Sequence, residues 1–476
     1  MTLTAAKYEG LLRFDPAGAG GLLEAVNPAL GPVLGLVVNL NDTRSSVTIA
    51  RAENLTDLVF FRKRYVMASG GYTFQPTTRG QAGGGAYFPP MSVWIPAGGK
   101  GLTREGALQA ALGEYFERFQ GAFEFLVPDQ EAAFATTAEL ATSGRRILGP
   151  DQVTFFHDRQ FAAGFPYAPF SNERRLAWTA FRDVHDGGEV LVPAQLAYLT
   201  RIRKHGEELV TYSSTGGLAF GRDFADAFEH GLLEYIERDA VNLAWISGIP
   251  ARRIELDTAD LANTVTRLAG SLAQNLVFID FATDLPGVFV VGAYGHYRGL
   301  FLGGAGADFT FDGALFKAAG EIMQCYDSLR DTLNLPAGLA QRKLVKEDLF
   351  EFSLILQYYS QPDKRPVVET WAQSLEATHA SKLRARPAGQ DLAGLLQHLK
   401  ASGLPVLFKE FRVKRVLPTL SGALVRVLPP FLIPAHIPNT PFLGNPRYLN
   451  APVAFGLRAE PLQYDDLNLA EPVPMP

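Results

Sequence analysis

The sequence predicts a mixed α+β fold built from repeated units in which a β-strand is followed by a helix. Three observations support this fold class. Apolar runs of strand length recur along the chain together with amphipathic helical patterns. Strands and helices do not alternate strictly, which argues against a doubly wound parallel sheet. A glycine-rich stretch precedes a helical pattern three times, near residues 103, 223 and 313, and this repetition predicts related units around one central site.

The predicted elements follow in order along the chain. Short β-rich runs fill the region up to about residue 66, and a Gly- and Pro-rich loop spans 67–101. The charged, helix-prone segment 360–399 indicates an inserted or lid-like part, and the proline-rich region from Pro446 onward is expected to lie extended along a surface. We expect an N-terminal α/β region at 1–80 and a second region at 81–476. The helical patterns cover about 103–120, 223–245 and 313–329, and the strand-like runs cover 189–199, 275–283, 287–294, 405–412 and 422–429.

Composition and charge exclude several classes of protein. The chain has 476 residues, 47% hydrophobic and 20% charged, which is typical of a packed globular protein. Its formal net charge of -5 offers no broad positive field for nucleic acid or an anionic membrane surface. The single cysteine, Cys325, excludes an internal disulfide and a cysteine-based zinc site. No apolar stretch is long enough to span a bilayer and no secretory signal is present, so we expect a cytoplasmic protein.

Two helical patterns carry nearly the same five residues, EYFER at 114–118 and EYIER at 234–238. Residues three and four apart share one face of a helix, so each helix presents two carboxylates beside an arginine. One such face alone is most often solvated, with weak local ion pairs. The repetition favours a shared site, because four converging carboxylates need cations and oxygen ligands suit Mg²⁺. The acids are Glu114, Glu117, Glu234 and Glu237, and the arginines are Arg118 and Arg238.

The same reasoning predicts a nucleotide beside the acids. Two Mg²⁺ ions would balance four glutamates, and arginines and loop amides would hold the phosphates of ATP. No P-loop is involved, because the stretch AGGKGLT lacks the order Gly-Lys-Ser/Thr. The third helix repeats the acid pattern weakly with Glu321 and Gln324, for which a ligand contact and a core position both stay open. His230 lies one turn before Glu234, where a place in the nucleotide site competes with a core role.

Four stretches in this order resemble the signature regions of the YcaO-domain family. They are GKGLTREGALQAALGEYFERF, SSTGGLAFGRDFADAFEHGLLEYIERDAV, GGAGADFTFDGALFKAAGEIMQ, and LGNPRYLNAP followed by PVPMP. The resemblance covers roughly 83–476 and implies a YcaO-like fold whose units surround a central ATP site. It also implies binding of ATP and Mg²⁺ and activation of peptide backbone amides. The best-known relatives convert Cys, Ser or Thr of a precursor peptide into thiazolines or oxazolines.

Carried over by position, the resemblance assigns roles to most of these residues. It implies metal binding by Glu114, Glu117, Glu234 and Glu237. It implies nucleotide contacts for Arg118, Asp226, His230, Arg238 and Lys317, to which the third helix adds Glu321 and Gln324. Some positions depart from the family pattern: Ala110 and Ala219 replace serine, Asp226 replaces glutamate and Lys317 replaces arginine. The metal ligands are therefore retained while the nucleotide contacts are altered, since lysine cannot bind phosphate bidentately.

The PxPxP ending at Pro472, Pro474 and Pro476 is similar to that of azoline-forming relatives, in which the C-terminus reaches toward the active site. The resemblance therefore places these three residues among the catalytic ones, with the Pro476 carboxylate as a candidate base. Without the resemblance, a proline-rich end would be read as unstructured.

The resemblance also implies partners. We expect a ribosomal precursor peptide, a leader-binding partner similar to ubiquitin-activating enzymes, a flavin-dependent azoline dehydrogenase where azolines are oxidised, and a hetero-oligomer in a bacterial cytoplasm. Two other interpretations stay open. The same ATP site could serve backbone thioamidation or macroamidine formation, or the chain could be a non-catalytic scaffold that binds the precursor.

Overall fold

The chain is described here from a computed structural model. The described residues are 39–42, 65–74, 91–100, the six single positions 110, 113, 114, 117, 118 and 121, and then 131–199, 205–333, 343–350, 352, 354–386, 391–411 and 422–475.

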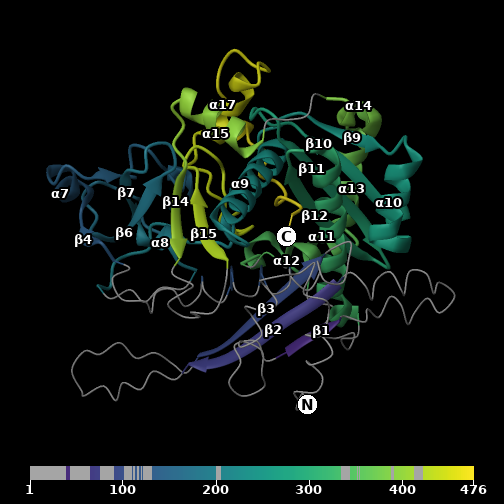
Figure 1. The fold of residues 1–476 in the computed structure, drawn as a ribbon, viewed down its shortest axis with the longest axis horizontal. Helices are drawn as coiled ribbons and strands as arrows, with labels where there is room; N and C mark the ends of the chain where they lie inside the picture. Colours follow the sequence, from purple (N-terminus) through teal and green to yellow (C-terminus); the bar gives the residue numbers. More distant parts are fainter. Residues whose placement is uncertain are drawn as a thin grey trace.

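A seven-stranded, largely antiparallel sheet forms one side of the molecule (Figure 1). Its continuous order is β5-β7-β6-β14-β15-β8, and β4 pairs with β6 beside this path. A short helix, α7 (Thr137–Thr142), begins with a capping box and covers the outer end, and α8 (Ala194–Ala197) follows β7 directly. The strands are β4 (Ala133–Ala135), β5 (Arg146–Ile147), β6 (Leu176–Asp183), β7 (Glu189–Pro193), β8 (Leu218–Gly221), β14 (Leu407–Phe411) and β15 (Ala423–Leu428).

A five-stranded sheet forms the other side, in the order β12-β11-β10-β9-β13. Its strands are β9 (Ala251–Glu255), β10 (Leu276–Phe281), β11 (Phe289–Tyr297), β12 (Leu300–Asp308) and β13 (Ala377–His379). Strand β13 runs parallel to β9 and completes the sheet edge. The helices of the surrounding segments are α10 (Ala259–Ala269), α12 (Leu354–Ser360), α13 (Arg365–Ser374), α14 (Ala380–Arg384) and α15 (Leu392–Ala401).

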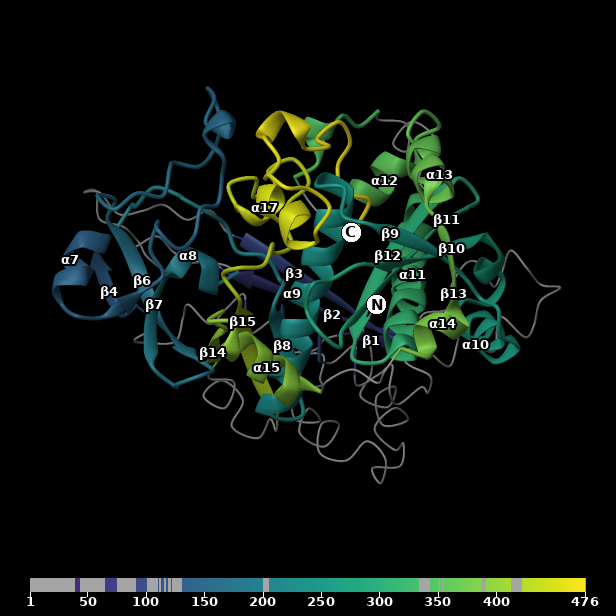
Figure 2. The same cartoon turned by 90° about the horizontal axis from the view of Figure 1, so that it is seen from above.

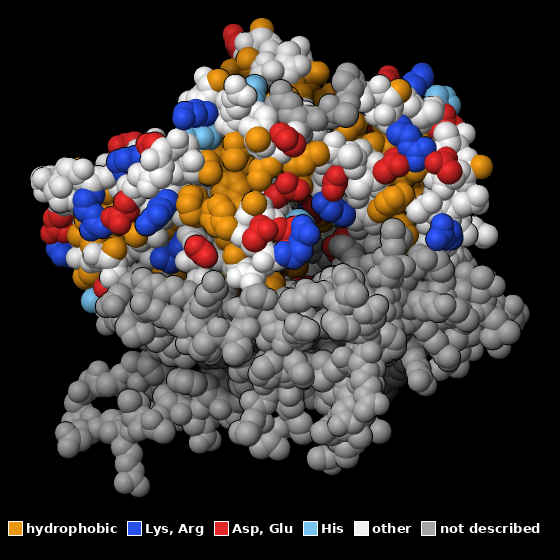
Figure 3. Space-filling model, in the orientation of Figure 1, with side chains coloured by type: hydrophobic (Ala, Val, Ile, Leu, Met, Phe, Trp, Pro, Cys, Tyr) orange, Lys and Arg blue, Asp and Glu red, His pale blue; other side chains and the backbone are white. Residues whose placement is uncertain are grey.

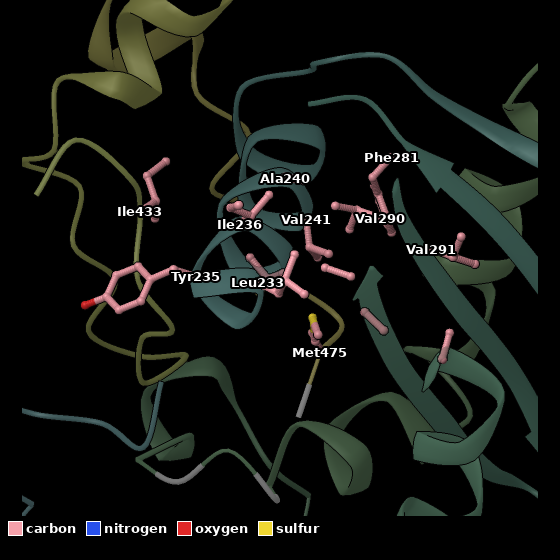
Figure 4. Packing of buried hydrophobic residues seen from close by; sticks show 14 of the residues in the cluster. Leu233, Tyr235, Ile236, Ala240, Val241, Phe281, Val290, Val291, Ile433 and Met475 are labelled. Atoms are coloured by element: carbon pink, nitrogen blue, oxygen red, sulfur yellow. The ribbon is translucent and has the colours of Figure 1, made fainter. Parts of the chain in front are cut away.

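The long helix α9 (Phe224–Ile246) runs between the two sheets, as Figures 1 and 2 show from two directions. Fifteen of its 23 residues are buried, which explains its apolar sequence on almost every side. Helix α11 (Phe311–Leu333) packs on β12 and β11. The side chains of Leu233, Ile236 and Val241 face the core that α9 shares with the strands (Figure 4). The units β8-α9 and β12-α11 are the expected strand-then-helix units, so the α+β fold class is confirmed.

A separate three-stranded antiparallel sheet, β1-β2-β3, lies next to α11 (Figure 1). Its strands are β1 (Asn39–Asp42), β2 (Tyr65–Phe74) and β3 (Met91–Lys100). Strands β1 and β2 precede the predicted boundary at residue 80, and β3 follows it. The boundary itself stays a prediction.

Three stretches that were predicted as glycine-rich loops contain strands. Strands β2 and β3 occupy about half of 67–101, and β8 lies within YSSTGGLAFG. Strand β12 carries the stretch GGAGAD, and its glycines let α11 approach closely. A Cβ atom added to Gly304 would lie 2.3 Å from the Cβ of Glu321, and one added to Gly306 would lie 2.4 Å from the Cβ of Lys317. These glycines therefore serve helix-to-strand packing rather than a turn.

Three further expectations need correction. The run 189–199 is not one strand, because β7 ends at Pro193 and α8 begins immediately after it. The segment 360–399 is not a separate insertion, since β13 extends the five-stranded sheet. The proline-rich end of the chain lies along a surface only in part, because most residues of 456–470 are exposed whereas 472–475 are not. After α17 (Arg447–Ala454), the segment 468–475, called the tail here, runs into the interior, where 472–475 are buried. Among the described residues, no helix is long and apolar enough to cross a membrane.

Candidate active site

Helix α9 brings Glu234, Glu237 and Arg238 to one side of the space between the sheets. The helix begins at the N-cap Asp223, whose side chain accepts a hydrogen bond from the backbone N–H of Asp226. The loop before β8 reaches back to the helix, and the backbone N–H of Gly217 donates to Glu234 Oε2 at 3.0 Å. Gly217 has a φ of 76°, and an added Cβ would lie 2.3 Å from the ring of Tyr235. Only glycine permits this approach.

The first repeat contributes Glu114, Glu117 and Arg118, which are helical in the structure. Arg118 Nη2 lies 2.5 Å from Glu114 Oε1, which is the expected pair four residues apart on one helical face. Gln324 of α11 donates from Nε2 to Glu114 Oε2 at 3.4 Å. The helix of the first repeat and α11 therefore meet at Glu114, and a predicted nucleotide contact lies beside a predicted metal ligand.

Electrostatic coupling joins the acids of the two repeats. Loss of surrounding water raises the pKa of Glu117 well above its ordinary range, and the charges of Glu234 and Glu114 raise it further. Burial also raises the pKa of Glu234, against the opposing charge of Arg238, and the neighbouring Glu237 adds to the rise. Carboxylates that repel one another in this way favour a bound cation, and their oxygens are the ligands that Mg²⁺ prefers.

Three of the four carboxylates contact protein donors in the structure. In the part of the chain that the structure describes, no group of three or more His, Cys, Asp or Glu side chains could together hold a metal ion. The carboxylates instead contact protein donors: Arg118 for Glu114, the Gly217 amide for Glu234, and Arg238 Nε at 3.7 Å for Glu237. The charge and chemistry of the four glutamates fit divalent cations, while their joint role as ligands stays a prediction.

Arg426 is a buried cation beside the acids that the sequence analysis missed. It lies on β15 with 2% of its surface exposed. Its guanidinium donates to the Ser214 carbonyl at 2.7 Å and the Gly216 carbonyl at 2.9 Å. It also donates to Ser213 Oγ at 3.1 Å and the Ala197 carbonyl at 3.3 Å. Its charge lowers the pKa of Glu117 and of Glu234, so it offsets part of the repulsion between the acids.

A second cluster of predicted residues lies near the first turns of α9 and α11. Arg222 Nη2 donates to Asp226 Oδ1 at 3.0 Å. Burial alone would raise the pKa of Asp226, but the hydrogen bonds from the side chain and backbone of Arg222 lower it below its ordinary value. Lys317 Nζ lies 2.9 Å from Asp308 Oδ2 and donates to the Ala307 carbonyl at 2.8 Å. Loss of water lowers the pKa of His230, against the attraction of Asp226.

The residues predicted to contact the nucleotide therefore influence one another electrostatically. Lys317 acts on His230, and Asp226 acts on it with the opposite sign. Glu321 lies farther along α11, over Gly304 of β12. Around a hollow near the middle of the face in Figure 3, acidic and basic side chains gather.

The end of the tail lies beside Arg238 of the second repeat. Pro472 and Pro474 are buried, and Pro476 lies outside the described residues. Met475 lies between α9 and the five-stranded sheet (Figure 4). A small cavity separates the tail from α9, lined by Arg238, Val241, Asn242, Phe352, Ala435, His436, Pro438, Val473 and Met475. The structure therefore brings the tail next to one predicted phosphate ligand, Arg238.

The raised carboxyl pKa values predict how stability depends on pH. The pKa of Glu117 is higher in the folded protein than its ordinary value of 4.5, so the folded state binds more protons than the unfolded state between these two values. The free energy of unfolding should therefore fall as pH rises through this window. Urea denaturation at a series of pH values, without Mg²⁺ or nucleotide, measures this slope.

The variant Glu117→Gln should make this slope less steep, because its amide does not titrate. Glu234 and Asp239, whose pKa values burial also raises, keep part of the slope in the variant. An unchanged slope in Glu117→Gln would contradict the electrostatic description of this site.

Comparisons with known proteins identify the family and the fold of the chain. The profile of a family described as an ATP- and Mg²⁺-binding YcaO cyclodehydratase matches residues 98–432. A solved heterocyclase in complex with substrate and cofactor aligns with a TM-score of 0.68 at 19% identity, over 97% of this chain and 57% of that one. The chain thus spans little more than half the length of that heterocyclase. A search among curated proteins finds no match.

Two further structures share the fold. YcaO from Methanopyrus kandleri, bound with AMPPCP and Mg²⁺, aligns with a TM-score of 0.50 at 18% identity, over 83% of this chain and 86% of that one. The E. coli microcin synthetase McbBCD complex with pro-MccB17 bound aligns with a TM-score of 0.51 at 16% identity, over 85% and 96%. At such identities the likeness shows the fold. The family description confirms the expected cofactors, ATP and Mg²⁺, while the number of ions stays a prediction. Because the profile spans most of the sequence, the chain belongs to the YcaO family.

Proposed function

We propose that this chain catalyses the ATP- and Mg²⁺-dependent cyclodehydration of Cys, Ser or Thr residues in a ribosomally made precursor peptide. The products are thiazolines or oxazolines. The observation that carries the proposal is the coupling of Glu117 with Glu234 across two helices of a YcaO fold. A scaffold gains nothing from placing acids that repel one another in its interior, whereas a site for cations and phosphate depends on them.

The proposed reaction removes one water from the peptide at the expense of ATP. The thiol or hydroxyl of the substrate residue gives its proton to a base and attacks the preceding carbonyl carbon. The resulting oxyanion takes the γ-phosphoryl group of ATP, and ADP leaves. The former carbonyl oxygen then leaves with phosphate while the amide nitrogen loses its proton, which forms the C=N bond of the ring. Bound Mg²⁺ supplies charge stabilisation for the phosphates.

The chain's own residues divide the remaining tasks. Glu114, Glu117, Glu234 and Glu237 hold the metal, and Arg118 and Arg238 neutralise phosphoryl oxygens. Asp226, His230 and Lys317 contact the nucleotide near the first turns of α9 and α11, with Glu321 and Gln324 farther along α11. The proposed proton acceptor is the Pro476 carboxylate, and Pro472 and Pro474 direct the chain toward it.

The substrate and partners follow from the same proposal. The precursor peptide is captured by a leader-binding protein similar to ubiquitin-activating enzymes, so the active unit is a hetero-oligomer. The shared fold with a synthetase complex that is described with pro-MccB17 bound supports this arrangement. A flavin-dependent dehydrogenase acts afterwards where azolines are oxidised to azoles.

Incubation of the purified chain with its partner, a precursor peptide, ATP and Mg²⁺ tests the proposal. We expect the peptide to lose the mass of one water for each ring, and ATP turnover to rise when peptide is added. A peptide with alanine at every Cys, Ser and Thr should show neither effect. A mass change that requires sulfide would replace the proposal with thioamidation, and ATP turnover that ignores the peptide would favour a scaffold.

A further inference from the structure

The tail is fixed along its length by contacts to α9, to α12 and to the residues that flank α12. Asn468 donates from its backbone N–H to the Ile246 carbonyl at 2.9 Å and from Nδ2 to the Trp245 carbonyl at 3.0 Å. Lys346 Nζ then donates to the Leu469 carbonyl at 2.5 Å. Asn468 is therefore tied to the last turn of α9, the helix that carries Glu234, Glu237 and Arg238 nearer its middle.

Glu471 is the most heavily bonded residue of the tail. Lys364 Nζ donates to its Oε1 at 2.6 Å, and the Tyr358 hydroxyl donates to its Oε2 at 2.6 Å. Trp245 Nε1 donates to its backbone carbonyl at 3.0 Å. The carboxylate and the ammonium are only 21% and 24% exposed, so this pair is shielded more than a surface salt bridge. Lys364 and Tyr358 thus hold the side chain of Glu471, while Trp245 of α9 holds its backbone.

Contacts of the residues after Glu471 place the end of the tail. The Tyr359 hydroxyl donates to the Pro472 carbonyl. The carbonyl of Pro474 lies so close to β12 that a Cβ added to Gly303 would be 3.2 Å from it. Val473 and Met475, 9% and 7% exposed, then form the wall of the cavity that faces Arg238. The anchor therefore sets how far the end of the tail extends into the site.

We propose that Glu471, held by Lys364 and Tyr358, anchors the tail, so that Glu471 and Lys364 are positioning residues for the step that modifies the peptide. This inference rests on the proposed function. The anchor contacts neither the glutamates nor the predicted nucleotide residues through any of these bonds. It acts on the geometry of 472–475, so its loss affects turnover and leaves metal and nucleotide binding intact.

The variants Lys364→Met and Glu471→Gln test the anchor. In each, we expect kcat for peptide modification to fall about tenfold or more, as is usual when a supporting hydrogen bond is removed. The dissociation constant for AMPPCP with Mg²⁺ should stay within about twofold of the unchanged protein. Hydrogen exchange of the backbone amides in 468–475, measured by mass spectrometry, should become about tenfold faster because the tail detaches more often.

The double variant Lys364→Glu with Glu471→Lys tests whether restoring the ion pair also restores function. It reverses both charges but keeps the pair, so we expect it to recover slow exchange of the tail and most of kcat. A matched control is Lys343→Met, which removes an exposed pair with Asp363 in the same part of the chain and should change neither reading. The conservative variant Lys364→Arg should keep kcat near its original value.

The readings separate the two proposals. Slow tail exchange and full kcat in Lys364→Met and Glu471→Gln would overturn the anchor. A fall in AMPPCP affinity as large as the fall in kcat would also overturn it, because the effect would then lie in the nucleotide site. If the unchanged protein modifies no peptide, the proposed function fails, while faster exchange with unchanged AMPPCP affinity would still show the anchor itself.

Discussion

The variant Glu237→Gln is expected to lose ATP-dependent dehydration of the precursor peptide almost completely. The substitution keeps the size of the side chain and removes one negative charge from the predicted metal ligands. Losing one preorganised electrostatic contact of this kind lowers kcat by about 100-fold to 1000-fold. The rate of phosphate release and the mass of the peptide, followed in the same reaction, measure the effect.

A matched control for this result is Glu410→Gln, which makes the same chemical change at an exposed position on β14. It should leave both readings unchanged. The affinity of Glu237→Gln for AMPPCP should depend less on the Mg²⁺ concentration, since the variant contributes less charge to the ions. Full activity in Glu237→Gln would remove this glutamate from the metal set and contradict the four-glutamate site.

The variant Arg426→Met is expected to lower the free energy of unfolding by about 3–5 kcal/mol, the usual cost of breaking a buried charged network from one side. The Ser214 and Gly216 carbonyls would lose a donor, and Glu117 and Glu234 would lose a buried positive charge. The pKa values of both glutamates should rise further above their ordinary range. Urea denaturation at constant pH measures the loss of stability.

Two other arginine substitutions should lower the free energy of unfolding by less than Arg426→Met does. Arg145→Met removes an exposed pair with Glu189 and should cost less than about 1 kcal/mol. Arg426→Lys should fall between the two, because it keeps the charge but cannot donate to several carbonyls at once. Wild-type stability in Arg426→Met would contradict the role of Arg426 as a buried donor to these carbonyls and as a cation beside the glutamates.

The helices could be predicted because their signals are long and local. Helix α9 was expected at 223–245 and lies at Phe224–Ile246, since capping by Asp223 and a continuous apolar pattern both mark it. Glycine is common both in turns and where two elements pack closely, which is why the predictions of glycine-rich loops were wrong. It marks turns, but in β12 it marks a strand on which a helix packs closely, and a single sequence does not separate these cases.

The parts of the site that depend on contacts between distant residues leave weaker patterns in the sequence. Arg426 is one charged residue in a strand of otherwise apolar residues, and nothing local indicates that its partners lie more than 200 positions earlier. The burial of the tail depends on Trp245, Tyr358 and Lys364, which come from distant elements. Strand β13 has only three residues, too few for a periodic pattern to show.

The anchor at Glu471 also orders events during synthesis of the protein. Trp245 and Glu471 are 226 positions apart, and Tyr358 precedes Glu471 by 113. Domains begin to fold while the ribosome is still adding residues, at roughly 5–20 per second. Helix α9 and both large sheets therefore emerge before the tail, and the pocket beside Arg238 stays open until the tail arrives. A chain whose translation stops before residue 468 would keep the glutamates yet lack Val473 and Met475, so this wall of the cavity forms only after the tail has been synthesised.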